Sequence, residues 1–326
     1  MTNLYPTAER PFTSPFVKEQ VESMRKQFPD LAIDVRVIEG ERPRWPYLRE
    51  MLFLPFVVKK GGYDIVHAHF GLTLVSMLLV RAPVVITFHG SDLLVNPTKH
   101  ISRLLAPKAS KVIVVAKRLR KSLGYGEVIP CGIRVKNFTL PSRLTNRRTP
   151  RMTGELKVLF SSDPARKIKD YGLFQDTCQE LARRGNKVEE VHLVNISREN
   201  VREIYWNCDV MLLTSLSEGS PTVIKEAIAA KLPFVSVDVG DVKEWAELVE
   251  FGVVVPNRDP KSIADAVITL LSTIKQRELL DNGKCLEMMD LENIAKRIRR
   301  IYHELQKNGF KEERNKKRGS FRICRH

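Results

Sequence analysis

The strongest constraint on the fold is an alternation of β-like and helix-like segments that runs along the chain twice. In the first series, strands are expected at 31–38, 64–70, 82–90 and 111–116, and helices at 16–28, 47–59, 73–79 and 101–107. In the second, strands are expected at 157–162, 188–195, 208–215, 233–239 and 252–256, and helices at 171–184, 201–207, 222–230, 242–249 and 260–274. Strands that alternate with helices form parallel sheets covered by helices. The sequence therefore predicts an α/β protein with two doubly wound, Rossmann-like domains that face a cleft, the expected ligand site.

The predicted domain boundaries follow from length and from one polar segment. The chain has 326 residues, which suits two domains of roughly 150 residues each. The segment 141–155 (PSRLTNRRTPRMTGE) has the composition of a linker. We predict an N-terminal domain at 1–146, a second domain at 147–290, a C-terminal helix at 291–307 and a basic, disordered tail at 308–326. The helix carries one apolar stripe, formed by Ile294, Ile298, Ile301 and Leu305.

Charge and cysteine content narrow the class of protein. The net charge is +16, and it divides into +11 for residues 1–146, −3 for 147–290 and +8 for 291–326. Such asymmetry suggests an anionic partner, either a membrane surface, a nucleic acid or a phosphorylated substrate, although solubility alone is an alternative reason. No basic–aromatic nucleic-acid motif is present. The five cysteines are dispersed without a C-x-x-C pair, which argues against a disulfide framework or a zinc site and favours a cytoplasmic location.

One segment of the basic half suggests a membrane contact. No signal peptide is recognisable, and the longest apolar runs are too short to span a bilayer. The segment 48–60 (LREMLFLPFVVKK) mixes apolar bulk with Arg49, Lys59 and Lys60. This composition fits an interfacial helix at the inner face of a membrane. The alternative is a helix that covers the sheet.

The stretch SEGSPTVIKEA (217–227) contains the first candidate site. It follows a predicted strand, so Glu218 lies on a loop at the carboxyl edge of the sheet and Glu226 lies two turns into the next helix. We expect Ser220 to cap this helix. The helix start then offers the N–H groups of Thr222 and Val223 to an anion, between two carboxylates that can accept hydroxyl groups. Compensation of the helix dipole and a solvated Glu226 is an equally good explanation on spacing alone.

Two further strand ends carry candidate residues. SSDPARKIKDY (161–171) places Arg166, Lys167 and Lys169 where they can neutralise a diphosphate, although a solvated basic turn is the alternative. ITFHGSDLL (86–94) places His89 at the end of a buried strand, and Ser91 and Asp92 are expected to cap the next helix. In HAHF, His67 and His69 point to the same side of a strand, but a third metal ligand is lacking.

Together these motifs resemble the retaining GT-B glycosyltransferases of family 4. SEGSPTVIKEA is similar to their Glu-x7-Glu motif. Five other segments occur in the order expected for the family: NLYPTAERPFTSPF, HAHFG, TFHGSDL and VIPCGI before this motif, and LPFVSVDVGDVKE after it. The nearest type is the bacterial surface-polysaccharide transferases, including teichuronic acid biosynthesis. The resemblance implies a cell-envelope enzyme that moves a sugar from a UDP-, GDP- or other nucleotide-sugar to a lipid-linked saccharide, with the leaving phosphate as base and neither a metal nor another cofactor.

The same resemblance assigns roles to individual residues. It implies that Glu226 binds the nucleotide ribose and that Glu218 binds the donor sugar hydroxyls. Arg166 and Lys169 would bind the diphosphate. His89 contacts the donor sugar, and the acceptor side includes His69. The remaining members of the donor site, by resemblance, are Gly219, Thr222 and Val223.

The sequence also departs from the family pattern. Pro221 stands where glycine is usual, Cys131 replaces an asparagine, and Asp163 replaces a phosphate-binding arginine, so that Arg166 is a substitute. By this comparison we expect the first strand of the N-terminal domain to be missing, because the text begins where that strand should end. Either the true start lies upstream, which we favour, or the domain is built without this strand and is weakened. We therefore expect unpaired neighbouring strands and a cavity. Two alternatives remain: a nucleotide-sugar epimerase of the same fold, and a non-catalytic nucleotide-sugar-binding protein disabled by the missing strand.

Overall fold

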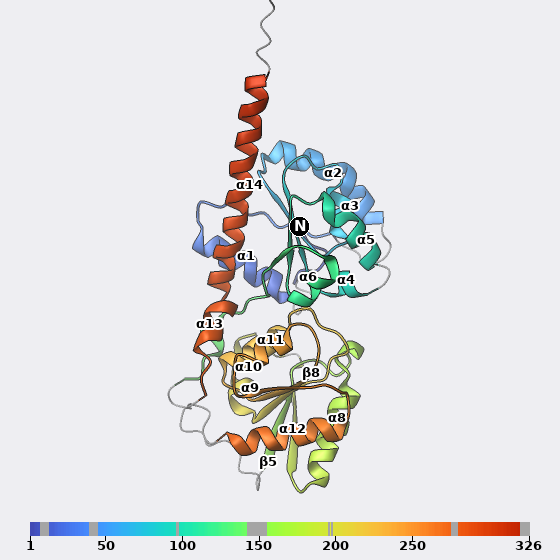
Figure 1. Cartoon of the computed structure of the whole chain (residues 1–326), viewed down its shortest axis with the longest axis vertical. Coiled ribbons are helices and arrows are strands. Elements are labelled where there is room, and N and C mark those ends of the chain that lie inside the picture. Colours follow the sequence, from blue (N-terminus) through green and yellow to red (C-terminus); the bar gives the residue numbers. More distant parts are fainter. Residues whose placement is uncertain are drawn as a thin grey trace, which may run out of the picture. The chain divides into compact units, whose positions relative to one another are not determined.

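The computed structural model describes residues 1–6, 13–38, 45–95, 98–141, 155–194, 196, 198–274 and 280–319. The chain forms two compact units (Figure 1). Unit 1 contains Met1–Val115, Leu119–Ile129 and Ile294–His326, and unit 2 contains Ala116–Arg118 and Pro130–Asn293. The predicted linker lies almost wholly outside the described residues, which resume at Glu155.

Unit 1 is built on a four-stranded parallel sheet in the order β1-β2-β3-β4. The strands are β1 (Val66–His69), β2 (Val84–Phe88), β3 (Lys111–Val114) and β4 (Glu127–Val128). All five residues of β2 are buried, as a continuous apolar strand inside a covered sheet should be. The helices of this part of the chain are α1 (Pro15–Gln27), α2 (Trp45–Gly61), α3 (Thr73–Met77), α4 (Ser91–Leu94), α5 (Thr98–Leu105) and α6 (Lys117–Leu123), with a 3-10 turn η1 (Ala106–Lys108).

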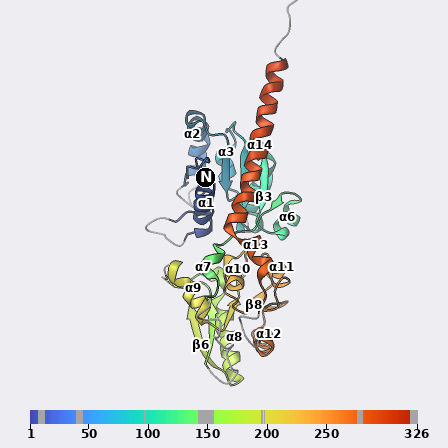
Figure 2. The same cartoon turned by 90° about the vertical axis from the view of Figure 1, so that its left-hand side faces the viewer.

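The C-terminal helix α14 (Leu291–Gly319) completes unit 1. Its apolar stripe joins Met24 of α1 and the buried sheet residues Val85 and Ile113 in one hydrophobic cluster. Figures 1 and 2 show α14 and α1 on one face of the sheet, with α3 and α5 on the other. Because α14 continues to Gly319, the predicted disordered tail is wrong for 308–319, where charged residues without proline continue the helix. Residues 320–326 lie outside the described residues.

The edge of the sheet beside β1 differs from the prediction. Residues 31–38 are extended but are not a strand, and only Val37 forms a bridge, with Thr2. Met1 lies between this segment and β1: its amino group donates to the His67 carbonyl at 2.6 Å, and its own carbonyl accepts from the His69 N–H at 2.9 Å. The prediction of a strand at 31–38 was wrong because only two residues lie alongside it to form a ladder.

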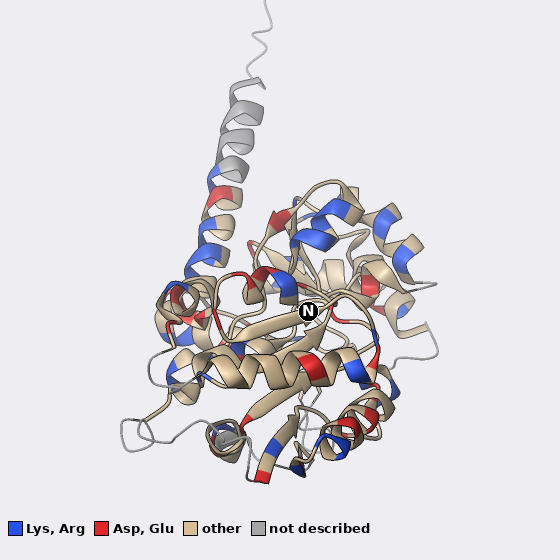
Figure 3. Ribbon diagram, turned by 60° about the horizontal axis from the view of Figure 1, so that its bottom comes forward, with Lys and Arg blue, Asp and Glu red and all other residues tan. Residues whose placement is uncertain are grey.

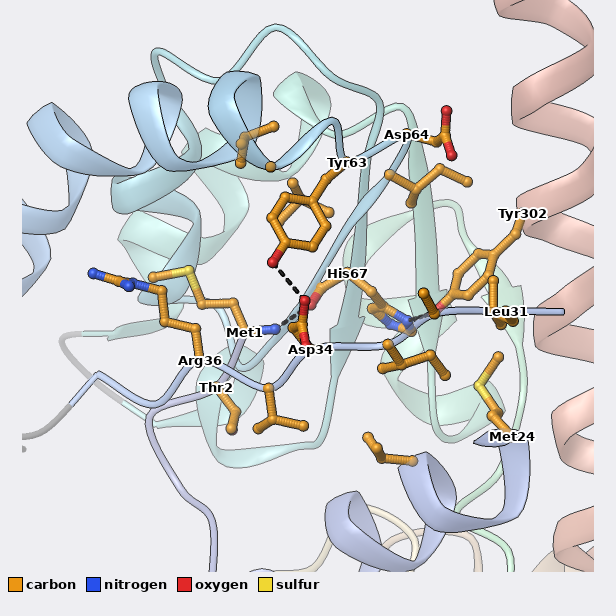
Figure 4. A pocket seen from close by; sticks show the side chains of 18 of the residues that line it. Met1, Thr2, Met24, Leu31, Asp34, Arg36, Tyr63, Asp64, His67 and Tyr302 are labelled. Carbon is orange, nitrogen blue, oxygen red and sulfur yellow. Dashed lines mark hydrogen bonds between the residues drawn. The ribbon is translucent and has the colours of Figure 1, made fainter. Parts of the chain in front are cut away.

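A pocket of about 600 Å³ opens at this place, as expected (Figure 4). His67 lines it from β1, Met1 from beside that strand, Leu31 from the extended segment and Tyr302 from α14. Burial lowers the pKa of the Met1 amino group to about 5. Other apolar side chains in its wall are Val17, Val21, Met24, Ile33, Val35, Leu54, Val57 and Val58.

Unit 2 contains a five-stranded parallel sheet in the order β6-β5-β7-β8-β9. Its strands are β5 (Glu155–Phe160), β6 (Lys187–His192), β7 (Val210–Leu213), β8 (Phe234–Val237) and β9 (Gly252–Val255). β5 lies between β6 and β7 and pairs with β6 over six residues and with β7 over three. The helices are α7 (Val135–Phe138), α8 (Tyr171–Arg183), α9 (Arg198–Asn207), α10 (Thr222–Ala229), α11 (Val242–Ala246), α12 (Pro260–Thr273) and α13 (Gly283–Met289), with a 3-10 turn η3 (Lys167–Lys169).

Candidate functional site

The topology of unit 2 selects one place for a ligand. The strand order reverses at β5, since β6 lies on one side of it and β7, β8 and β9 follow on the other. In a parallel α/β sheet the crevice at such a reversal, at the carboxyl ends of the two strands, is the usual binding site. The chain that leaves β5 continues into η3, and the chain that leaves β7 continues into the loop 214–221. Two of the predicted motifs therefore meet here.

Lys169 and Glu218 form an ion pair at this reversal. The Lys169 Nζ donates to Glu218 Oε1 at 2.5 Å, and the two side chains are 12% and 15% exposed. The structure thus brings together two predicted site residues that are 49 positions apart in the sequence. A partly buried ammonium and carboxylate can exchange their mutual contact for an anionic and a hydroxyl-bearing group of one ligand.

The backbone at these strand ends is fixed by Arg258, which sequence reasoning did not identify. Its guanidinium donates to the carbonyl oxygens of Thr214 and Ser215 after β7, at 2.5 and 2.9 Å, and to Asp170 Oδ2 at 2.5 Å. The Thr214 hydroxyl donates to the carbonyl oxygens of Lys169 and Asp170, each at 3.0 Å. Because both loops share these bonds, the position of Lys169 relative to the β7 loop is well defined. No sequence pattern marked Arg258, which lies 40 residues after Glu218.

A second network anchors the Glu218 loop from inside the unit. Ser220 Oγ donates to Asp241 Oδ2 at 2.6 Å, and the ammonium of Lys225, which is 0% exposed, donates to Ser220 Oγ at 2.7 Å. Trp245 Nε1 also donates to Asp241 Oδ2, at 2.8 Å, and its ring lies 5.1 Å from Lys225 Nζ. Removing one partner of such a buried ion pair strongly destabilises the fold, because the other charge is left buried without compensation. The sequence signal that could have revealed it is a lysine inside the apolar run VIKEAIAA.

This network corrects the predicted helix start. α10 begins at Thr222 with Pro221 at the cap position and no side-chain cap, because Ser220 is engaged with Asp241. The helix start therefore lacks a protein cap, as an anion site requires. Gly240, at φ +58°, comes so close to the Gly219 carbonyl that an added Cβ would lie 2.7 Å away. The glycine is needed to let the two loops touch.

The other predicted donor residues differ in accessibility. Glu226 is only 1% exposed, and its Oε2 accepts from the Tyr205 hydroxyl at 2.8 Å. Thr222 and Val223 are half-buried, whereas Arg166 and Lys167 are exposed. The Arg166 carbonyl accepts from the Lys169 N–H at 2.8 Å, so the two basic residues belong to one turn. Their side chains differ in burial, and Arg166 is the more exposed of the two.

In unit 1 the corresponding strand-end residue is Asp92, which is 5% exposed. Its carboxylate accepts N–H groups from Gly90 at 2.8 Å, from His89 at 3.1 Å and from Gly71 at 3.2 Å. It thereby ties the loop after β2 to the loop after β1. The predicted side-chain cap of the next helix is therefore incorrect, and α4 has no side-chain cap. Burial raises the pKa of Asp92 to about 6, although the hydrogen bonds oppose this.

Three histidines follow one another across these strand ends. The rings of His67 and His69 stack with centroids 4.5 Å apart, which confirms that they point to the same side. His69 Nδ1 lies 3.0 Å from His89 Nε2, and His67 contacts the Tyr302 hydroxyl at 2.5 Å and Thr87 Oγ1 at 2.7 Å. Burial lowers the pKa of His67 and of His89 to about 3, so both are neutral at pH 7. These histidines are not arranged as metal ligands, since within the described residues no group of three or more His, Cys, Asp or Glu side chains could hold a metal ion.

Family models match a region of the chain in each of the two units. A model described as "Glycosyltransferase Family 4" matches residues 15–137, and one described as "Glycosyl transferases group 1" matches residues 168–273. Both models describe glycosyltransferases. The second match contains the Lys169–Glu218 pair, and the first contains the three histidines.

Curated relatives agree with this result. A Bacillus subtilis protein assigned to teichuronic acid biosynthesis, the glycosyltransferase TuaC, is 27% identical over 55% of this chain and 54% of its own length. The chain thus matches about half the length of this relative. A phosphatidyl-myo-inositol mannosyltransferase of Mycobacterium leprae is 23% identical, with 90% of each chain covered.

Solved structures establish the fold as GT-B. The Anabaena protein Alr3699/HepE in complex with UDP superimposes with a TM-score of 0.64 at 16% identity, covering 86% of this chain and 89% of that chain. A sucrose-phosphate synthase of Thermosynechococcus elongatus gives a TM-score of 0.63 at 18% identity, covering 84% and 82%. Among the described helices, none combines the length and the apolar character needed to cross a bilayer.

Proposed function

We propose that the protein is a retaining glycosyltransferase that moves a sugar from a nucleotide-diphosphate sugar to a saccharide acceptor of the cell surface. The observation that carries the proposal is the Lys169–Glu218 pair at the strand reversal of unit 2. A nucleotide-sugar offers a diphosphate to the lysine and sugar hydroxyls to the carboxylate. The solved relatives that bind UDP and UDP-glucose support this class of donor.

Each remaining residue of the site receives a role from its chemistry. Lys169, with Arg166 on the same turn, neutralises the diphosphate, and the uncapped start of α10 adds the N–H groups of Thr222 and Val223 beside Gly219. Glu226 binds the ribose, for which the nucleotide must share or replace the Tyr205 hydrogen bond. By resemblance, His89 contacts the donor sugar and His69 lies on the acceptor side.

The proposed reaction needs no protein nucleophile. The bond between the anomeric carbon and the diphosphate oxygen breaks, and the acceptor oxygen bonds to the anomeric carbon on the same face. The acceptor proton passes to an oxygen of the departing diphosphate. Lys169 and Arg166 stabilise the negative charge that develops on that group, the kind of electrostatic contribution that dominates many transfer reactions.

The acceptor and the cellular location of the reaction are further parts of the proposal. Relatives named for teichuronic acid biosynthesis and for phosphatidyl-myo-inositol mannosyl transfer support a lipid-linked saccharide, used at the inner face of the membrane. Two cations and an uncapped helix start already match the charge of the diphosphate, so the proposal includes no metal or organic cofactor.

Calorimetry with UDP, GDP and ADP tests the donor site. Lys169→Ala should weaken binding of the preferred nucleotide by roughly ten-fold or more, the loss expected for one charge-assisted contact. Glu226→Gln and Tyr205→Phe should alter affinity as well, because both act on the ribose. The matched control is Lys157→Ala, which removes a lysine paired with Glu189 elsewhere on the sheet. Equal effects of Lys169→Ala and Lys157→Ala would rule out the assignment.

Analysis of the product tests the stereochemistry. With the donor found by calorimetry, NMR of the transferred sugar should show the anomeric configuration of the donor. Glu218→Gln should lower kcat more than it raises KM, since the proposed sugar contact acts mainly in the transition state. An inverted product would exclude the retaining mechanism, and hydrolysis of the donor at full rate without an acceptor would exclude a transferase.

A further inference from the structure

Helix α2 carries large apolar side chains on the face that points to solvent. Trp45 is 68% exposed, Leu52 66% and Phe56 67%, while Phe53 and Leu48 are 58% and 44% exposed. Residues spaced by three, four and seven positions lie on one face of a helix, so the first three form a single ridge. A soluble protein rarely exposes so many large apolar groups together unless the surface binds something.

The ridge is not the face that packs inside unit 1, where α2 lies against α3. That face is formed by Tyr47, Leu54 and Val58, each less than 9% exposed, and by the buried carboxylate of Glu50. At 100° per residue these positions point to the opposite side from Trp45, Leu52 and Phe56. Helix α2 thus has two apolar faces, and the interior of unit 1 accounts for only one. The sequence alone could not distinguish the two faces of LREMLFLPFVVKK.

The charges beside the ridge have one sign. Arg49, Lys59 and Lys60 are exposed along it, and Arg49 is 62% exposed. The single acidic residue of α2 is Glu50, which is buried and paired with Arg36 at 2.6 and 2.9 Å. The solvent face of α2 therefore combines aromatic and aliphatic side chains with cations and contains no carboxylate. Figure 3 shows Lys and Arg bands recurring along α14 of the same unit.

We propose that this face of α2 is a lipid-binding surface that inserts Trp45, Leu52 and Phe56 into an anionic bilayer. Apolar side chains enter the boundary between headgroups and acyl chains, and the three cations contact anionic headgroups. A tryptophan at one end of the ridge suits the interface, where its ring is half in an apolar and half in a polar environment. The inference rests on the proposed location at the inner face of the membrane and names the surface that binds there. It does not depend on the donor chemistry.

Flotation of the full chain with lipid vesicles tests the proposal. The protein should float with vesicles that contain phosphatidylglycerol and much less with pure phosphatidylcholine, and salt should release it. The double variant Leu52→Glu/Phe56→Glu should lower the bound fraction by roughly ten-fold or more, because two apolar groups can no longer be buried. Lys59→Gln/Lys60→Gln should weaken binding by roughly five-fold for each lysine and remove much of the salt dependence.

The matched control is Leu104→Glu, which makes the same change at a leucine 77% exposed on α5 of the same unit. It should leave vesicle binding unchanged. Melting curves identify any variant that fails to fold. Nucleotide affinity of unit 2 should be equal in all variants, so that failure of this proposal is distinct from failure of the proposed function. Absence of vesicle binding, or equal binding by the wild-type chain and the Leu52→Glu/Phe56→Glu variant, would overturn it. Self-association that this variant abolishes, without vesicle binding, would make the face a protein interface instead.

Discussion

The two sheets differ in how completely one strand is formed between its neighbours, and the comparison separates the contacts that position a site from those that stabilise a unit. In unit 2, β5 has six residues paired on one side by six positions of β6 and on the other by three of β7. In unit 1, Met1 and Thr2 occupy the corresponding place between β1 and the segment 31–38, and a pocket follows them. Yet the loops at the strand ends of unit 1 are held by buried hydrogen bonds, as are those of unit 2.

The comparison shows that loops at the strand ends depend on local bonds. Asp92 connects the two loops in unit 1, and Arg258 and Asp241 connect the loops in unit 2. The body of a strand such as β5 contributes mainly buried apolar surface and ladder hydrogen bonds. We therefore expect changes in the strand bodies to alter stability, and changes in the loop anchors to alter the sites.

The largest effect should come from giving unit 2 a cavity like that of unit 1. Leu159 of β5 is 0% exposed, and Leu159→Ala should lower the free energy of unfolding of unit 2 by about 4 kcal/mol, through lost burial and an unfilled hole. Fluorescence of the buried Trp206 and Trp245 follows this unit in urea. Leu193→Ala, at a half-buried position, is the control and should cost less. Equal losses would mean that a fully buried side chain of β5 contributes no more to stability than a half-buried one.

The second largest effect should be a loss of stability of unit 1 at acidic pH. The pKa values of His67 and His89 are lowered to about 3, so the unfolded chain takes up protons below pH 6.5 that the folded unit does not. The buried Met1 amine acts in the same direction between pH 8 and pH 5, whereas Asp92, with its pKa raised to about 6, opposes both. Stability should therefore fall by on the order of a few kcal/mol from pH 7 to pH 5.

Hydrogen exchange of β2 peptides at several pH values measures this effect. His67→Gln should reduce the slope, since one proton fewer is linked to unfolding. A slope identical to that of the wild-type chain would show that this histidine is not buried neutral.

Filling the pocket should make unit 1 more like unit 2. A variant with five β-branched and apolar residues placed ahead of Met1 would extend the short ladder between β1 and the segment 31–38. We expect about 1 to 2 kcal/mol of added stability, because apolar burial exceeds the entropy of ordering the added residues only by a small margin. Thermal melting compares it with a Gly/Ser extension of equal length. If both melt alike, the pocket does not accept a strand.

The smallest effect concerns the rim of that pocket. Tyr302→Phe removes the hydroxyl that contacts His67 Nδ1 at 2.5 Å but keeps the ring of α14 in place. We expect a loss of about 1 kcal/mol in unit 1 and none in unit 2. Hydrogen exchange resolves the two units, and an equal change in both would contradict the local origin of the effect.

Much of this architecture could be read from the sequence. The predicted segment 82–90 contains β2 and 208–215 contains β7, because continuous apolar runs identify buried strands even where their ends are uncertain. The short β4, together with α6 and α13, was missed, since these elements are too brief for a periodic pattern. The segment 31–38 alternates as a strand should, but a strand also needs a partner along its length.

The candidate site could be predicted only in part. Lys169 and Glu218 follow strands and were identified from that position, and the parallel sheet brings them together. Lys225, Asp241 and Arg258 were not identified, because a buried charge is recognisable only through its partner. The burial of Glu226 against Tyr205 likewise depends on how α9 and α10 pack, which no local pattern reports.

The path of α14 has a consequence for how the protein is made. Ile294, Ala295, Ile298 and Ile301 complete the cluster that covers one face of the first sheet, yet they are synthesised after the whole of unit 2. A ribosome releases the chain from its N-terminus, so the first unit emerges with Val85, Ile113 and Ile129 still uncovered. The later unit consists almost entirely of the continuous segment Pro130–Asn293, so it is complete before the last helix of unit 1 is synthesised. We therefore expect unit 1 to reach its final packing only after unit 2 has been synthesised.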